Sequence, residues 1–246
     1  MDAQLLTQFL KWAVGRNYLR KVPEIKSPKK RDPKASRRSV FSDDDVRHML
    51  DFSIYWVKRS SNQQIRRGYC FGYVSLILYS GLRPKEARLL KWRDVQQDQV
   101  VLLNVNEQGK TGERTVVALP AAKAVLDYIR GLGGDTSPDA YVFPGAAGGA
   151  TASFEHLFKS MVTYLGLTSE DSRDRTIYSL RHTYTTFRLI HGKVDVFKLA
   201  SNLGTSAETI RLHYAHVLNQ NMAGDLNQND QSGFDNEWGV SLQGFG

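Results

Sequence analysis

The sequence contains a single cysteine, Cys70, among 246 residues. One cysteine excludes an internal disulfide and a cysteine-based metal cage. Cys70 stands in the apolar stretch YCFGYVSLILYS, which favours a core position over a nucleophilic one. No apolar run approaches the length of a membrane span. The amphipathic N-terminus, MDAQLLTQFLKWAVGR, has neither a signal-peptide core nor a small-residue cleavage site. We therefore expect a cytoplasmic protein with no membrane partner.

Motifs for metal ions and nucleotides are also missing from the sequence. There is no HExxH pattern, no EF-hand loop and no Walker-type phosphate loop. The glycine-rich stretch GAAGGA at 145–150 does not have the Lys and Ser/Thr ending that a phosphate loop requires. We expect chemistry that uses no cofactor.

Acidic residues are outnumbered: 25 Asp and Glu stand against 33 Lys and Arg, which gives a net charge of +8. A basic balance favours polyanionic partners, because phosphate contacts release counterions. A soluble basic protein without such a partner would have the same balance. The positions of the charges along the sequence are therefore needed to distinguish the two. The hydrophobic content of 41% allows a sizeable core.

Hydrophobic periodicity predicts a mainly helical chain with one small pair of strands. Ser42 to Asp45 form an acidic helix start of the capping-box type, Gly81 and Gly204 end helices, and Pro84 suits a first helical turn. The expected helices span 3–19, 66–80, 152–165, 177–191, 194–203 and 206–215, with others starting at about 42, 84 and 120; the strands span 99–105 and 114–119, joined by a polar turn at 106–113.

Four segments suggest chemistry on a phosphodiester. They are SGLRPKEARLLKW (80–92), NEQGKTGERTVVALP (106–120), TIYSLRHTYTTF (176–187) and LGTSAETIRLHYAHV (203–217). Arg83 and Arg181 each carry a permanently charged, planar guanidinium group, whose paired N–H donors match the non-bridging oxygens of a phosphate. Two such groups would stabilise the charge of a transition state. Either one alone would be read as a solvated helix arginine.

The other two segments supply a proton donor and a nucleophile. Lys110 lies in the polar turn, from which its amine could protonate a leaving alkoxide, although an exposed turn lysine is the simpler reading. Tyr214 could attack phosphorus and form a phosphotyrosine that needs no ATP, or it could be a core tyrosine beside Ile210. Glu86, three residues after Arg83, is interpreted as a carboxylate that orients an arginine; a surface glutamate is the alternative.

These four segments, in this order, resemble the arginine, hairpin-lysine, second-arginine and nucleophile boxes of the tyrosine recombinases of the phage integrase family. The resemblance covers residues 40–217. It implies that Arg83, Lys110, Arg181 and Tyr214 are catalytic. It also implies a mixed α+β fold, mainly helical, with a small antiparallel sheet. Four boxes in order are far more specific than any one of them.

The sequence departs from the family pattern at two positions. Tyr178 stands where the family has a histidine or lysine, and Thr205 where it has a histidine or tryptophan. Tyr178 is a poor proton acceptor, since a phenol has a reference pKa of about 10, and Thr205 does not titrate. We hypothesise slower or conditional cleavage by the same mechanism. The hypothesis fails if Tyr178→His and Thr205→His both leave the cleavage rate unchanged or lower it. His182 and His216 could compensate, although local packing is the simpler role for both.

The resemblance also divides the chain. Residues 1–20 are expected to be the last helix of a preceding core-binding domain, 21–39 a basic linker, 40–217 the catalytic domain and 218–246 a polar tail. The linker has three prolines and is expected to cross the DNA backbone, although a solvated tether would look the same. Its expected DNA contacts are Lys29, Lys30, Arg31, Lys34, Arg37 and Arg38. The tail carries Phe234 and Trp238, which could dock on a neighbouring subunit.

Family behaviour implies a DNA integrase or recombinase of a mobile element, in a bacterial or phage context and associated with the nucleoid. It implies a homotetramer on two paired DNA sites. Two alternatives remain open. One is a DNA-binding protein of the same fold that has lost efficient cleavage, which Tyr178 and Thr205 favour. The other is a type IB topoisomerase-like enzyme that relaxes DNA without exchanging strands.

Overall fold

The computed structural model describes residues 3–23, 40–105, 113–145, 147–168 and 175–214. It divides into two compact units, 1–37 and 38–246. In the first unit, α1 (Ala3–Gly15) is the predicted N-terminal helix and ends four residues before the expected position 19. Asn17 then takes a positive φ of 61°, which turns the backbone out of the helix. The ring of Trp12 contacts those of Phe9 and Tyr18, although all three side chains remain exposed.

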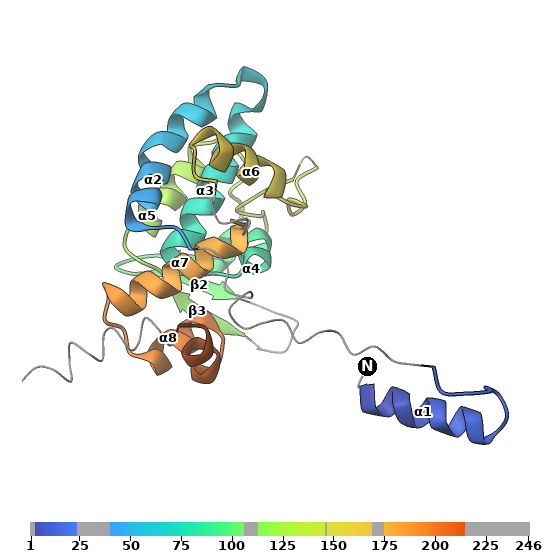
Figure 1. The fold of residues 1–246 in the computed structure, drawn as a ribbon. Coiled ribbons are helices and arrows are strands. Elements are labelled where there is room, and N and C mark those ends of the chain that lie inside the picture. The colour runs from blue at the N-terminus through green and yellow to red at the C-terminus, as the bar shows by residue number, and fades with distance from the viewer. Residues whose placement is uncertain (1–2, 24–39, 106–112, 146, 169–174, 215–246) are drawn as a thin grey trace, which may run out of the picture. The chain divides into compact units, whose positions relative to one another are not determined.

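The second unit is built around α3 (Gln64–Ser80), which packs against α2 (Asp43–Lys58), α4 (Pro84–Leu89), α5 (Ala122–Arg130), α6 (Glu155–Tyr164) and α7 (Ile177–Ile190). In Figure 1, α3 runs through the middle of this unit, with α2 and α5 beside it. Most of its side chains are buried, Cys70 among them. The nearly continuous apolar sequence of this helix therefore reflects neighbours on all sides.

Helix ends follow the predicted sequence signals. The hydroxyl of Ser42 accepts a hydrogen bond from the backbone N–H of Asp45, and the carboxylate of Asp45 accepts one from the N–H of Ser42. This is the predicted capping box of α2. Gly81 (φ 69°) and Gly204 (φ 62°) end α3 and α8 (Val196–Leu203) in the left-handed conformation.

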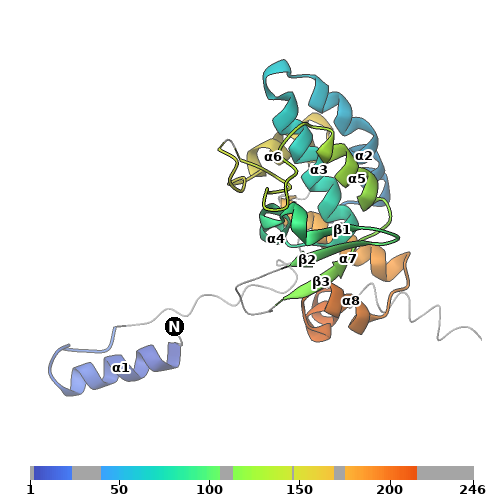
Figure 2. The same cartoon turned by 180° about the vertical axis from the view of Figure 1, so that it is seen from behind.

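The sheet has three antiparallel strands in the order β1 (Val95–Gln97), β2 (Val101–Val105) and β3 (Arg114–Val117). The sequence predicted two strands, so β1 corrects that expectation. Its three residues, Val-Gln-Gln, are too short and too polar to show an alternating pattern, and pairing with β2 is what makes them a strand. Seen from behind, the sheet lies beside α8 (Figure 2), and its strand β3 packs against that helix.

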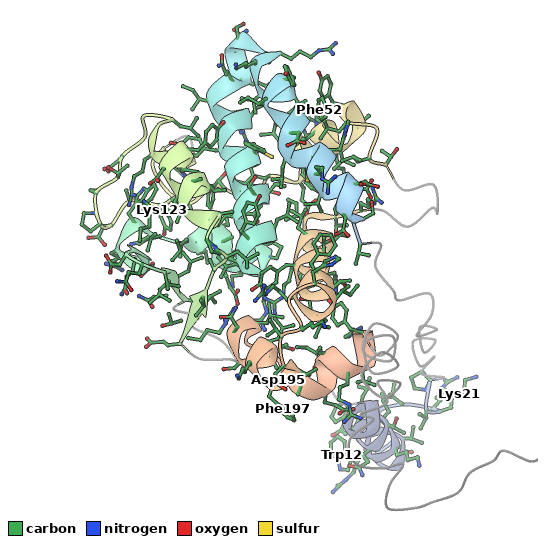
Figure 3. All side chains as sticks on the ribbon, turned by 90° about the vertical axis from the view of Figure 1, so that its left-hand side faces the viewer. Trp12, Lys21, Phe52, Lys123, Asp195 and Phe197 are labelled. Atoms are coloured by element: carbon green, nitrogen blue, oxygen red, sulfur yellow. The ribbon has the colours of Figure 1, made fainter. Side chains whose placement is uncertain are left out.

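Two hydrophobic clusters fill this unit. The larger one surrounds α3; the smaller one contains Tyr184, Leu189, Leu199, Ala200, Leu203, Ile210 and Tyr214. A last described helical segment, 207–214, belongs to the smaller cluster. At the start of α8, Asp195 caps the helix by accepting from Phe197 and Lys198, whereas the ring of Phe197 points into solvent (Figure 3).

No helix within the described ranges is both long and apolar enough to cross a membrane. Lys110, the linker residues Lys29 to Arg38, His216 and the tail from 218 lie outside the described residues.

Candidate active site

Three arginines from distant parts of the sequence bind successive carbonyl groups at the C-terminus of α8. Arg114 Nε donates to the carbonyl of Asn202 at 3.3 Å, and Arg181 Nη2 to that of Leu203 at 2.7 Å. Arg83 Nη2 donates to the carbonyl of Gly204. The last carbonyls of a helix have no partner within the helix and carry its negative dipole end. The end of α8 therefore gathers three positive charges within one helical turn.

Arg83 is held by the turn that precedes α4. It follows the left-handed Gly81 by two residues and is the N-cap of α4, with Pro84 at the first helical position. Glu86 accepts the backbone N–H of Arg83 at 2.8 Å and its Nη1 at 2.7 Å. A carboxylate three residues after the N-cap thus fixes both the backbone and the guanidinium of Arg83.

Glu86 is shared between two arginines. Its Oε2 also accepts from Arg114 Nη2 at 2.7 Å, and its side chain is fully buried. Burial by itself would raise the pKa of this carboxyl group. Hydrogen bonds from Arg114 and from the backbone N–H of Arg83 outweigh burial and hold the pKa below its usual value. Glu86 is therefore a buried carboxylate that orients arginines, as the sequence indicated.

Arg181 ties the ends of two helices together. It lies in α7 and is only 5% exposed. Its Nη1 donates to the carbonyl of Gly81 at 2.7 Å, and its Nη2 reaches Leu203. Burial lowers the pKa of Arg181, and the charge of Arg83 adds to this while Tyr178 and Glu86 oppose it. Since a guanidinium has five N–H donors, two carbonyls leave capacity for an anion.

Tyr214 lies at the end of the helical segment 207–214 and is 8% exposed. Its hydroxyl makes a hydrogen bond with Nδ1 of His182, and the two ring centroids are 5.8 Å apart. Burial raises the pKa of Tyr214 to about 12, although the hydroxyl of Thr185 and the charge of Arg181 act in the opposite direction. The phenol is thus a weak acid that lies within the electrostatic influence of Arg181.

Tyr178 and Thr205 border the same region. Tyr178 is in the first turn of α7, and its ring packs on His182 with centroids 5.1 Å apart. Thr205 directly follows the left-handed Gly204, and its backbone N–H donates to the carbonyl of Ala200 at 3.0 Å. The N–H of Gly204 donates to the carbonyl of Ser201. The two hydrogen bonds together form a Schellman motif, which fixes the position of the Thr205 backbone.

The model of the phage integrase family matches residues 39–221, which is most of the chain. The chain belongs to the phage integrase family. This integrase-family chain is 28% identical over 145 residues to the tyrosine recombinase XerC of Xanthomonas axonopodis pv. citri (strain 306), covering 58% of the chain and 45% of that protein. It is 27% identical over 166 residues to the putative integrase/recombinase y4rB of Sinorhizobium fredii (strain NBRC 101917 / NGR234), covering 64% and 52%.

Solved recombinase structures share the fold of this integrase-family chain. The XerH site-specific recombinase, in a post-cleavage complex with palindromic difH substrate, superposes with a TM-score of 0.60 at 16% identity, covering 92% of this chain and 72% of XerH. The Tn1549 transposon integrase with transposon right end DNA gives 0.59 at 17% identity, covering 90% and 76%. The predicted α+β, mainly helical recombinase fold is thereby confirmed. The chain spans about half the length of the curated relatives it matches.

The sequence of this integrase-family chain does not single out one residue of the site, Arg114, and leaves the role of another, His182, open. Arg114 was passed over as the first residue of a strand, but it lies on the same face of β3 as the buried Val116, and period-two alternation could have turned it inward. For His182 the sequence allows either compensation or local packing, and the structure pairs its ring with the hydroxyl of Tyr214. Its position four residues after Tyr178 puts both on one face of α7.

The described residues contain no group of three or more His, Cys, Asp or Glu side chains placed to hold a metal ion.

Proposed function

We propose that this chain cleaves and rejoins DNA strands as a site-specific recombinase, through a phosphotyrosine intermediate. The observation that carries the proposal is the gathering of Arg83, Arg114 and Arg181 at the C-terminus of α8. Of these three, Arg181 acts electrostatically on Tyr214 and favours its ionised form. Positive charge of this density suits a phosphate that gains charge in its transition state. Family membership and the shared fold support the same reaction.

In the proposed reaction Arg83 and Arg181 bind the non-bridging oxygens of a DNA phosphate. The hydroxyl oxygen of Tyr214 attacks phosphorus, and the bond from phosphorus to the 5′ oxygen breaks. Lys110 protonates that leaving oxygen. A 5′ hydroxyl of another strand then attacks the 3′-phosphotyrosine, gives its proton to the now neutral amine of Lys110, and releases Tyr214. The energy of the broken bond is kept in the phosphotyrosine, so that neither ATP nor another cofactor takes part. Tyr178 and Thr205 are proposed to contribute hydrogen bonds at the same site.

Double-stranded DNA is the proposed substrate. The excess of Lys and Arg over Asp and Glu supports this choice, and the basic residues from Lys29 to Arg38 are proposed to contact the DNA backbone. XerH and the Tn1549 integrase were solved in complexes with DNA. By analogy with the family we propose a homotetramer on paired sites, a cytoplasmic location and a catalytic domain of residues 40–217.

The test is covalent attachment to supercoiled plasmid, which requires no knowledge of the target site. The protein is mixed with plasmid, denatured with detergent, and the DNA that precipitates with protein is measured. We expect attachment by the parent chain and none by Tyr214→Phe, because the variant keeps the ring but loses the attacking oxygen. Attachment by Tyr214→Phe at the parent level would overturn the proposal.

The second candidate is a DNA-binding protein that does not cleave. The specific observation in its favour is the burial of Tyr214, which raises its pKa to about 12. The same experiment separates the two functions: plasmid that binds the parent chain under native conditions, with no attachment after denaturation, would favour binding alone.

A further inference from the structure

Attack by Tyr214 requires the phenol to lose its proton. With a pKa of about 12, the hydroxyl is almost entirely protonated at neutral pH. The nearby positive charge of Arg181 acts to lower this pKa but does not overcome the burial. A group that takes the proton during the attack would remove this obstacle.

Two described side chains lie within hydrogen-bonding reach of the Tyr214 hydroxyl, and they differ in basicity. Thr185 is one, but its Oγ1 already donates to the carbonyl of Arg181 at 2.8 Å, and a neutral hydroxyl is a very weak base. The other is Nδ1 of His182. An unprotonated imidazole nitrogen is a far stronger base than a neutral hydroxyl, so His182 is the better proton acceptor of the two.

The surroundings of His182 hold its ring toward Tyr214. Tyr178, one helical turn earlier, packs against one side with ring centroids 5.1 Å apart. His213, from the helix of Tyr214 itself, lies 6.5 Å away by the same measure and is exposed. Arg181 precedes His182, but its guanidinium is bound to Gly81 and Leu203. The imidazole is therefore fixed on the face of α7 that meets Tyr214.

We infer that His182 is the general base of strand cleavage, accepting the proton of Tyr214 at Nδ1 as the hydroxyl oxygen bonds to phosphorus. This inference rests on the proposed function. The neutral ring carries its own proton on Nε2 and becomes an imidazolium, while the bond to the 5′ oxygen breaks. In the rejoining step the imidazolium returns the proton to the departing Tyr214 oxygen, so that His182 acts as base and then as acid. It supplies an imidazole that Tyr178 and Thr205 do not.

The test compares rates of covalent attachment to supercoiled plasmid for the parent chain, His182→Asn and His213→Asn. The amide oxygen of asparagine can still accept the Tyr214 hydrogen bond, but it does not take up a proton. We expect His182→Asn to attach about 100-fold more slowly or worse, with native plasmid binding unchanged. His213→Asn, which removes a neighbouring imidazole, should attach at the parent rate.

A second substitution distinguishes proton transfer from positioning. Replacing Tyr214 with a trifluorinated tyrosine lowers the pKa of the phenol, so that its proton is lost more easily without a base. In the His182→Asn background this replacement should recover at least about tenfold of the lost rate. A slow His182→Asn with no recovery would show a positioning role only and overturn the inference. Attachment by His182→Asn at the parent rate would overturn it while leaving the proposed function intact. No attachment by the parent chain would overturn the proposed function, and this inference with it.

Discussion

Glu86 carries a buried negative charge that has to be paired within the site. It is a fully buried carboxylate held between Arg83 and Arg114 at 2.7 Å from each. Burying a charge is costly unless it is paired, and removing one partner leaves the others uncompensated. The contribution of Glu86 is therefore best measured by removing its charge while keeping its shape.

We expect Glu86→Gln to lower the free energy of unfolding by about 3 kcal/mol, the lower end for a broken buried pair, because Arg83 is partly exposed. Glu113→Gln, an exposed residue beside Arg114, is the matched control and should change stability little. The measurement is denaturant unfolding of each variant at neutral pH.

The pH dependence of this difference has a definite sign. The pKa of Glu86 in the folded chain is lowered from the ordinary value of 4.5. Its charge therefore stabilises the fold fully above that value, and the stabilisation is lost as the pH falls through the lowered folded pKa. The difference in the free energy of unfolding between the parent chain and Glu86→Gln should be constant near pH 7. It should become smaller as the pH falls below about 4.5. A gap that widens on acidification would contradict this account of Glu86.

At the residue scale, the sequence anticipated the contacts of Glu86 with an arginine and the core position of Cys70. It left the role of His182 open between compensation and local packing, because an imidazole on a helix is ambiguous until the partner helix is known. The contact to Tyr214 joins residues 32 positions apart, and only the packing of 207–214 against α7 creates it. Arg114 was hidden for the same reason, since Glu86 reaches it across 28 positions.

At the scale of elements, the ends of α3 and α8 determine the geometry of the site. Arg181 binds the carbonyls of Gly81 and Leu203, so both helices must end where they do. A Cβ atom at Gly81 would meet the ring of Tyr184 and would lie 2.7 Å from a side-chain carbon of Leu203. Only glycine fits here, for conformational and for steric reasons.

We expect Gly81→Ala to destabilise the chain by about 2 to 5 kcal/mol, combining left-handed strain with overpacking. Gly166→Ala is the control, because Gly166 has nearly the same φ, +67° against +69°, with nothing within 4 Å of an added Cβ. Its cost should be about 1 to 2 kcal/mol from conformation alone. Equal losses for the two variants in denaturant unfolding would show that contact with Tyr184 and Leu203 contributes nothing.

Elements with local signals were the ones that the sequence predicted well. The capping box of α2, the left-handed glycines and Pro84 of α4 are encoded within a few residues of where they act. The strand β1 has no such local signal. Asn202 likewise joins α8 to β3 by accepting from the N–H of Val117 at 2.8 Å and donating to its carbonyl at 3.2 Å. A contact of this kind depends on tertiary packing and could not be read from either segment.

At the scale of the whole molecule, the order of the four segments along the chain predicted the fold, because the family of the chain follows from that order. Their convergence depends on packing: α3, α4, β3, α7 and α8 each deliver a side chain or a carbonyl to the arginine cluster. Strand cleavage by Tyr214 depends on this convergence and is therefore a property of the chain as a whole.

The most direct test of that claim is relaxation of supercoiled plasmid in the presence of EDTA, comparing the parent chain with Tyr214→Phe. One reversible cleavage by tyrosine releases supercoils, and neither a target sequence nor a metal ion has to be supplied. We expect relaxed plasmid with the parent chain and unchanged supercoiled plasmid with Tyr214→Phe. Relaxation by Tyr214→Phe, or by neither protein although both bind the plasmid, would contradict it.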